Sequence, residues 1–246
     1  MFNPPNLRRR SADEAEKPFW ISYADLMTAL MVLFLVVMLA SLAALVQSVR
    51  SAAEINKKNE QQAKELQTLK AQSAEYEDVR NRVKEEIQKV VKAHNLKFRR
   101  GSIIDFGTRA QFAQGSDELS DSQQAAIRDL APELIEKANS RDGLKVVERI
   151  IVEGFASPEG TYLGNLDLSA RRSQRVMCAL LDPPRSDSGE IRKLFATAGA
   201  SSSSLKKNRV KSRRIEMRIE YYPELQRPVP RAAVTGPVGT CALESE

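Results

Sequence analysis

The sequence is poor in the residues that usually build metal and catalytic sites. Its 246 residues include one histidine, His94, and two cysteines, Cys178 and Cys241, which lie far apart. Because a structural zinc site draws about four Cys or His ligands from closely spaced positions, we expect no metal site and no cofactor. No cysteine or serine motif lies beside His94, so we also expect no hydrolytic chemistry and no enzyme activity.

The chain also lacks a concentrated charge of one sign. Its formal net charge of +6 is spread along the sequence, and aromatic residues are not interleaved with the basic ones. This distribution argues against direct binding of nucleic acid. The moderate excess of Lys and Arg is compatible with contact to anionic membrane lipid or to a cell-wall polymer.

Long apolar runs are missing except for one. Residues 18–47 carry no charged side chain after Asp25, and as a helix they cover the roughly 30 Å of bilayer hydrocarbon. Asp25 lies in the first turns, close in sequence to Tyr23 and Thr28. An ionised carboxylate inside a bilayer costs roughly 2.5–3.5 kcal/mol, so an acid there indicates a function. The alternative is that Asp25 lies at the interface and caps the helix.

The residues before this helix predict its orientation. Residues 1–17 include Arg8, Arg9 and Arg10, which favour a cytoplasmic N-terminal tail and place everything after residue 47 on the far side of the inner membrane. A cleaved signal peptide is the rival interpretation. The apolar run is too long for a signal core of roughly 7–15 residues and contains an acid, so we expect an uncleaved anchor.

The run PFWISYADLMTALMVLFLVVML closely resembles the transmembrane helix of MotB-type stator subunits, whose signature is an aromatic residue, then Y-A-D, then M-T-A and an apolar run. The resemblance implies that Asp25 carries protons, with Tyr23 and Thr28 as supporting pore residues. It also implies a channel shared with a multi-span MotA-like partner, inside whose ring a homodimer of this subunit would sit.

Residues 48–96 are predicted to form a helical stalk, since they contain neither Pro nor Gly and are rich in Glu, Lys, Gln and Ala. One heptad seam is mostly apolar, and its companion is mixed. The first comprises Ile55, Gln62, Leu69, Tyr76, Val83 and Val90; the second comprises Ala52, Asn59, Leu66, Ser73, Arg80 and Ile87. Because a strict coiled coil would be cleaner at both positions, a loose parallel pair and a single spacer helix both remain open. The stator resemblance favours the pair.

Residues 97–222 show the alternation of a small α+β sandwich with helices on one face of a sheet. We expect strands at Ser102–Phe106, Val147–Glu153 and Arg214–Tyr222, and helices at residues 120–138, 167–181 and 191–197. Residues 223–246 are rich in Pro and Gly, so we expect a tail without regular structure. The fold class is therefore one transmembrane helix and a stalk followed by a βαβαβ sandwich.

Four segments of this domain resemble the OmpA-like peptidoglycan-binding domain. They are F-A-Q-G-S-D-E-L-S, V-E-G-F-A-S-P-E-G, N-L-D-L-S-A-R-R-S and S-R-R-I-E. In that family an Asp and an Arg fifteen residues later clasp the diaminopimelate of the stem peptide. Arg172 matches the Arg, whereas Ser157 replaces the Asp. We expect Arg172→Ala to abolish wall binding without affecting folding.

The loss of the acid matters because a zwitterionic ligand needs an anion for its amine and a cation for its carboxylate. Glu159 is the better candidate for the missing anion, and Asp167 is the poorer one. Asn165 and Leu168 match the family's helix-start signature, so the resemblance adds them to the peptidoglycan-binding residues.

An even cysteine count in an oxidising compartment predicts a disulfide between Cys178 and Cys241, which would hold the tail down. The alternative is that Cys178 is a buried core thiol. Taken together, the sequence predicts an ion-driven, wall-anchored stator subunit, with H⁺ favoured over Na⁺. The stalk, the terminal cysteine and the run Glu16–Ala29 resemble stator subunits of anti-phage defence more than flagellar ones. A flagellar MotB-type subunit and a passive membrane-to-wall tether are the alternatives.

Overall fold

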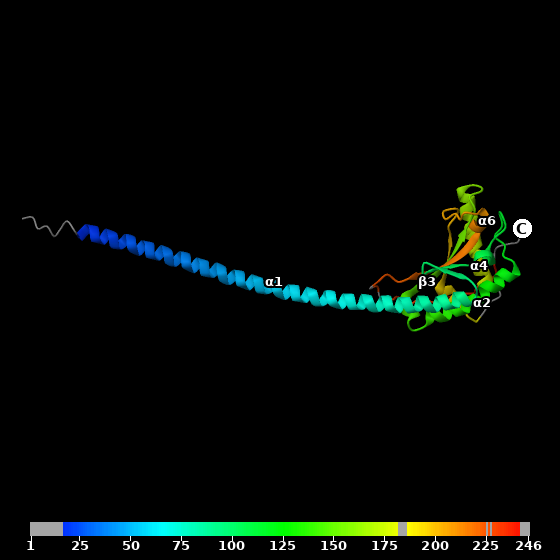
Figure 1. Ribbon diagram of the computed structural model, residues 1–246, viewed down its shortest axis with the longest axis horizontal. Helices are drawn as coiled ribbons and strands as arrows, with labels where there is room; N and C mark the ends of the chain where they lie inside the picture. Colours follow the sequence, from blue (N-terminus) through cyan, green and yellow to red (C-terminus); the bar gives the residue numbers. More distant parts are fainter. Residues whose placement is uncertain (1–16, 182–185, 225, 227, 242–246) are drawn as a thin grey trace, which may run out of the picture. The chain divides into compact units, whose positions relative to one another are not determined.

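The computed structural model describes residues 17–181, 186–224, 226 and 228–241 (Figure 1). The chain divides into two compact units, Met1–Thr68 and Leu69–Glu246. Helix α1 (Lys17–Ala93) contributes to both units. The predicted residues 1–16 of the N-terminal tail lie outside the described residues.

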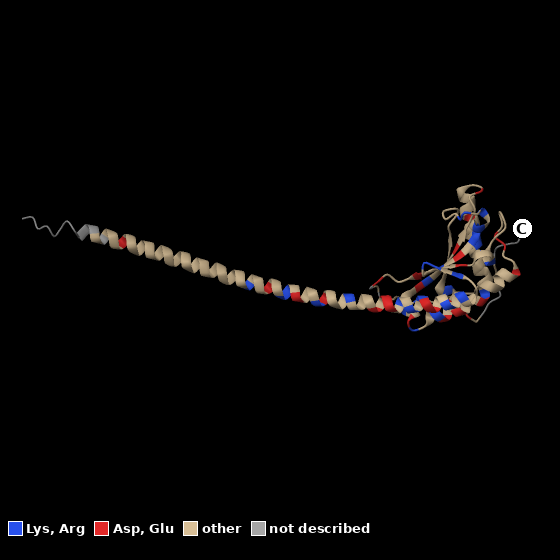
Figure 2. Cartoon of the chain, viewed as in Figure 1, with Lys and Arg blue, Asp and Glu red and all other residues tan. Residues whose placement is uncertain are grey.

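In the first unit, α1 carries the apolar run. Within the described part of the chain, α1 is the one helix long and apolar enough to cross a membrane. Figure 2 shows its uncharged stretch, with a single acidic residue near the N-terminal end. The apolar side chains there, such as Leu33 and Phe34, are about 60% exposed. Exposure on this scale is what a helix that meets lipid or a partner helix requires.

The second unit takes its first helical turns from the end of α1. Val79, Val83, Ile87 and Val90 are buried in its hydrophobic core. The residues from Leu69 to Ala93, expected in the stalk, therefore pack as part of the folded domain, and its boundary falls earlier than the predicted residue 97.

The sheet of the second unit has five strands in the order β1-β2-β5-β3-β4. The β3–β4 pair is parallel, and the other neighbours are antiparallel. The strands are β1 (Lys97–Arg99), β2 (Ile103–Asp105), β3 (Val147–Phe155), β4 (Phe195–Gly199) and β5 (Arg214–Tyr221). β5, the last strand in the sequence, thus lies in the middle of the sheet.

The remaining helices connect these strands, and all of them except α6 contribute residues to the same core. They are η2 (Gly107–Ala110), α2 (Asp121–Asn139), α3 (Gly143–Val146), α4 (Tyr162–Leu181), α5 (Ser188–Leu194) and α6 (Arg209–Ser212). Ser120 begins α2 with a capping box, in which its hydroxyl accepts from the Gln123 amide and the Gln123 side chain accepts from the Ser120 amide. Ile150 and Val152 of β3 face the core beside Met217 of β5.

The architecture confirms the α+β class and corrects the prediction at two strands. β1 was not predicted. The expected helix Ile191–Thr197 is wrong at its end, because α5 stops at Leu194 and β4 begins at Phe195. β4 is short, and its parallel pairing with β3 joins residues more than 40 positions apart, as between Ile150 and Phe195. A local sequence pattern does not contain that pairing.

Helix α4 approaches the sheet unusually closely. A Cβ placed on Gly154 of β3 would lie 1.9 Å from the Ser169 carbonyl oxygen, and one on Gly199 of β4 would lie 2.9 Å from the Ala170 amide. Two glycines therefore allow backbone to pack against backbone at this point, and they fix the start of α4 over the ends of both strands.

The C-terminal tail has no regular structure in its described part, as expected. It is held to the domain by Arg231, whose guanidinium donates to the carbonyls of Val147 at 2.8 Å and Glu148 at 3.1 Å and to Asn139 Oδ1 at 2.7 Å. Cys241 forms the predicted disulfide with Cys178, with a Cα–Cα distance of 5.5 Å. The tail is thus fastened at two points.

Candidate functional site

The acid of the apolar helix shares its helix face with Thr28. The Thr28 hydroxyl donates to the Asp25 carbonyl at 2.9 Å, and a shallow apolar groove continues from both residues along Ala29, Val32 and Leu33. Tyr23 is two positions away and so points about 200° around the helix from Asp25. One α1 helix therefore brings Asp25 and Thr28 together, but not Tyr23.

The expected wall-binding residues meet where β3 ends and α4 begins. Ser157 and Asn165 are buried, whereas Leu168 is half-buried and Glu159 is partly accessible, with a side-chain exposure of 30%. Gly160 has a φ of +90°, which turns the loop between Glu159 and α4 and is a conformation that favours glycine.

Glu159 is held in its charged form. A hydrogen bond from Ser157, its own backbone N–H and the nearby cations Arg209 and Arg213 all lower the pKa of the Glu159 carboxyl. Its Oε1 lies 3.2 Å from Arg209 Nε, on a side chain that is itself 74% exposed. Ser157 replaces the family's acid, but Glu159, two residues further on, supplies an anion in the same loop. The partner of Glu159 in this structure is Arg209, whose side chain faces solvent.

Arg172 differs from the expected accessible ligand group, because its side chain is fully buried. Its guanidinium donates to the Phe155 carbonyl at 2.8 Å, to the Ser116 carbonyl at 2.8 Å and to the Ala113 carbonyl at 3.1 Å. It also lies 4.8 Å from the Phe112 ring centroid. Burial lowers the Arg172 pKa to about 10. The side chain therefore ties the loop before α2 to the end of β3.

This geometry corrects the expectation that Arg172→Ala leaves folding intact. Removing the guanidinium would leave three carbonyl groups without their buried donor. Asp167, the poorer candidate for the missing anion, is 69% exposed and pairs with Arg171 at 3.3 Å. Among the predicted residues, Ser157 and Glu159 thus lie in the loop and Asn165 in the first turn of α4, while Asp167 faces solvent on the same helix.

Sequence reasoning missed one cation of this site. Arg213 donates from Nε to the Phe112 carbonyl at 3.1 Å and is half-buried. Its charge acts on both Glu159 and Arg172, since it lowers the pKa of each. The S-R-R-I-E segment contained this arginine, but its position beside Glu159 depends on the pairing of β5 with β3.

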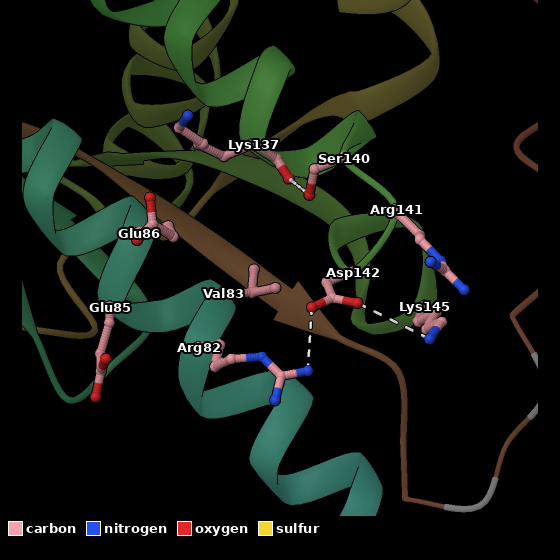
Figure 3. Close-up of a pocket in the computed structure, with 9 residues that line it drawn as sticks. All are labelled: Arg82, Val83, Glu85, Glu86, Lys137, Ser140, Arg141, Asp142 and Lys145. Carbon is pink, nitrogen blue, oxygen red and sulfur yellow. Dashed lines mark hydrogen bonds and ion pairs between the residues drawn. The ribbon is translucent and has the colours of Figure 1, made fainter.

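A separate hollow of about 740 Å³ lies between the last turns of α1 and the end of α2 (Figure 3). Its charges are largely matched. Asp142 accepts from Arg82 at 3.1 Å and lies 3.8 Å from Lys145, and both contacts are drawn in the figure. Glu85 and Glu86 face this hollow from α1. A surface with both signs interspersed does not select a ligand of either charge. No group of three or more potential metal ligands occurs among the described residues.

Comparisons with known proteins match the N-terminal part of the chain to a family model and nearly the whole chain to one relative. Residues 7–58 match the family model described as membrane MotB of the proton-channel complex MotA/MotB. Zorya protein ZorB of Escherichia coli O139:H28 (strain E24377A) is 39% identical over 236 residues, which cover 89% of this chain and 87% of that protein.

Two solved structures are similar to the chain at low identity. A putative MotB-like protein from Desulfovibrio vulgaris is 17% identical, with a TM-score of 0.40 and coverage of 62% of this chain and 98% of its own. The OmpA-like domain of FopA1 from Francisella tularensis is 18% identical, with a TM-score of 0.35 and coverage of 52% of this chain and 82% of its own.

An acid-bearing apolar helix that matches the MotB model, joined to a mixed α+β domain, defines a membrane-anchored stator subunit of the MotB-like class. Its similarity to the E. coli protein extends over nearly the whole of both chains and shows the particular family. The chain belongs to the ZorB family of the Zorya system.

Proposed function

We propose that this chain conducts protons through Asp25 as one of two copies inside a ring of a multi-span MotA-like (ZorA-type) protein in the inner membrane. The observation that carries this proposal is the position of Asp25 near the start of an exposed apolar helix, whose residues 26–47 carry no other charge. A passive tether has no use for an acid at that position, because the acid costs insertion free energy.

The relay requires the Asp25 carboxylate to alternate between a charged and a neutral form. A membrane potential supplies roughly 2.3 kcal/mol per charge per 100 mV, which is enough to shift a helix contact and too little to unfold a helix. The N-terminal tail then lies in the cytoplasm and the second unit in the periplasm, as the three arginines of the tail favour.

The test replaces the acid by its neutral isostere. Asp25→Asn keeps the size and hydrogen bonding of the side chain but cannot release a proton, so the variant should assemble with its partner and lose phage protection. Asp25→Glu, which keeps the carboxylate, should retain part of the protection. Full protection by the Asn variant would exclude the proton relay, and co-purification with the MotA-like partner separates this result from failed assembly.

The second unit is proposed to hold peptidoglycan through the loop between β3 and α4. Glu159 supplies the anion for an ammonium group, and Arg213 supplies the cation for the neighbouring carboxylate. The ligand ammonium would replace Arg209 as the partner of Glu159, because breaking an ion pair with an exposed arginine costs little free energy. Arg172 is a buried positioning residue for this site, because it fixes the loop before α2.

Binding of isolated sacculi tests this assignment and its pH dependence. Because the pKa of Glu159 lies below its usual 4.5, its charge is lost only as the pH falls below that value, so binding should persist between pH 7 and pH 5. Glu159→Gln should weaken binding at least about tenfold, whereas Asp167→Asn, on the solvent side of α4, should leave binding unchanged. Equal binding by the Glu159→Gln variant and the parent chain would exclude Glu159 as the anion.

A further inference from the structure

A second cavity, of about 420 Å³, lies beside the end of β2, next to η2 and the start of β5. Five cationic side chains and one carboxylate face it. The charged residues are Lys97, Arg109, Lys206, Lys211, Arg214 and Asp105. This one-sided charge sets the cavity apart from the hollow of Figure 3, where acids and bases are interspersed.

The one acid of the cavity is already satisfied. Asp105 lies 3.1 Å from Arg99 Nε and 3.8 Å from Lys206 Nζ, and its Oδ1 accepts from the Gly107 amide at 3.0 Å. The carboxylate is therefore neutralised by groups of its own cluster, and it does not offset the cations on the other side of the cavity.

Arg214 forms a rigid, buried wall of the site. It is 3% exposed, and its Nε donates to Glu216 at 2.8 Å while Nη1 donates to the Ser204 carbonyl at 3.1 Å. Its guanidinium also stacks 4.0 Å from the Phe155 ring centroid. A cation fixed in this way needs no reordering when an anion arrives, so it loses little side-chain entropy on binding.

Two of the five cations are already paired with a carboxylate, because Lys206 lies 3.4 Å and Arg214 lies 2.8 Å from Glu216. The other three are not. Arg109 donates to the His94 carbonyl. Within the described ranges, the exposed side chains of Lys97 and Lys211 have neither a hydrogen-bond nor an ion-pair partner. They come from distant parts of the chain, β1 and α6, and the fold brings them to one opening.

We propose that this cavity binds a phosphoryl group, meaning the tetrahedral dianion of a phosphate monoester. Several Lys and Arg side chains around one partly open cavity suit an oxyanion of charge about −2 better than a single carboxylate, which one arginine can neutralise. The volume leaves room for a sugar or glycerol carrying that group. The wall-binding loop, by contrast, presents both signs, so the two sites select different ligands.

The experiment titrates the full-length protein in detergent with inorganic phosphate, by calorimetry and by the shift in melting temperature. Sodium chloride and sodium acetate at matched ionic strength are the reference titrations, because a general salt effect would be shared by all three. We expect saturable binding of phosphate, a raised melting temperature, and no saturation by acetate.

A variant pair locates the site. Lys97→Gln/Lys211→Gln should weaken phosphate binding about tenfold or more while leaving the melting temperature without phosphate unchanged, since both side chains are exposed. Lys92→Gln, an exposed lysine of α1 that does not line the cavity, should bind as the parent does. Glycerol 3-phosphate and glucosamine 1-phosphate then compare a lipid-headgroup fragment with a phosphorylated sugar, and tighter binding of either supports the proposal.

Three outcomes would overturn it: no saturable phosphate binding, equal binding by the double variant and the parent, or saturation by acetate with the same affinity. None of these outcomes depends on sacculus binding or on phage protection. The experiment therefore tests the phosphate site independently of the function proposed for the rest of the chain.

Discussion

Arg172 illustrates how one buried side chain determines the shape of a site that it does not line. Its three nitrogen atoms donate to the carbonyls of Ala113, Ser116 and Phe155, which belong to the loop before α2 and to the end of β3, beside the proposed wall-binding site. The cost of placing a guanidinium in the interior is offset because each of its nitrogens has an acceptor.

Arg172→Ala should therefore destabilise the domain by about 3 kcal/mol, since it leaves buried carbonyls unsatisfied and opens a cavity. Arg171→Ala, at the next position but exposed, removes only a surface pair with Asp167 and should cost less than about 0.5 kcal/mol. Urea unfolding of both variants measures the difference. Equal midpoints for the two variants would show that Arg172 is not structural.

The resemblance to a family signature predicted Asn165 and Arg172 by their spacing, placed Ser157 where the family has its acid, and led to Glu159 as the nearby substitute anion. It did not reveal that Arg172 points inward or that Arg213 lies beside Glu159. Both facts depend on contacts between residues more than 50 positions apart, such as the Arg172–Ser116 and Arg213–Phe112 hydrogen bonds. Spacing along the chain carries residue identity, whereas the direction of a side chain is decided by packing.

Among the elements, α4 is the most tightly placed, because its first turns rest on glycine backbone. Gly154→Ala would push a methyl group to within 1.9 Å of the Ser169 carbonyl oxygen, and we expect a loss of about 3 kcal/mol or a shift of α4 from the sheet. Gly189→Ala in α5 is the matched control. A Cβ there meets nothing within 4 Å, so it should be neutral or stabilising by up to about 1 kcal/mol.

Thermal unfolding of these two glycine variants is the measurement. A Gly154→Ala variant that melts together with Gly189→Ala would show that α4 is free to relax away from the strand, contrary to the close packing described.

The α1 seam divides into two parts with different neighbours. Val83 and Val90 are buried in the domain, and Tyr76 packs against its core. Ile55, Leu66 and Leu69 are 47–56% exposed. A homodimer can therefore use the seam only before about residue 70, because the later seam residues already pack in the domain.

Cysteine cross-linking tests this division. Gln62→Cys lies on the exposed seam and should give disulfide-linked dimers under mild oxidation, whereas Lys64→Cys, about 200° around the helix, should not. Non-reducing electrophoresis of membranes reads out both. Equal cross-linking at the two positions would indicate random collision and not a parallel pair.

The elements with strong local patterns were predicted well: the apolar helix, α2 and the alternating strand β5. Those with weak patterns were not. β1 has three residues and β4 has five, of which four are Ala, Thr or Gly. Such strands exist because a neighbouring strand offers hydrogen bonds, and that information is not local.

At the scale of the whole molecule, the tail and its disulfide close a long loop over the domain. Cys178 and Cys241 are 63 residues apart, so on the chain-entropy model the link stabilises the fold by roughly 4 kcal/mol. Because Arg231 fastens the same tail independently, we expect Cys178→Ser to cost about 2–4 kcal/mol without releasing the whole segment.

Chemical unfolding with and without reductant measures this contribution. The parent chain should lose the same stability when reduced as the Cys178→Ser variant loses by mutation, and the variant should not respond to reductant. A parent chain that is unaffected by reductant while unfolding would argue against the disulfide.

The position of β5 in the sheet has a consequence for biosynthesis. Arg214–Tyr221 follows the other four strands in the sequence, yet it joins the β1–β2 pair to the β3–β4 pair. The sheet cannot assemble until β5 has been synthesised, so the domain condenses only after its last strand leaves the ribosome. Translocation across a membrane passes unfolded polypeptide, and a domain that stays open until its last strand emerges is suited to that route.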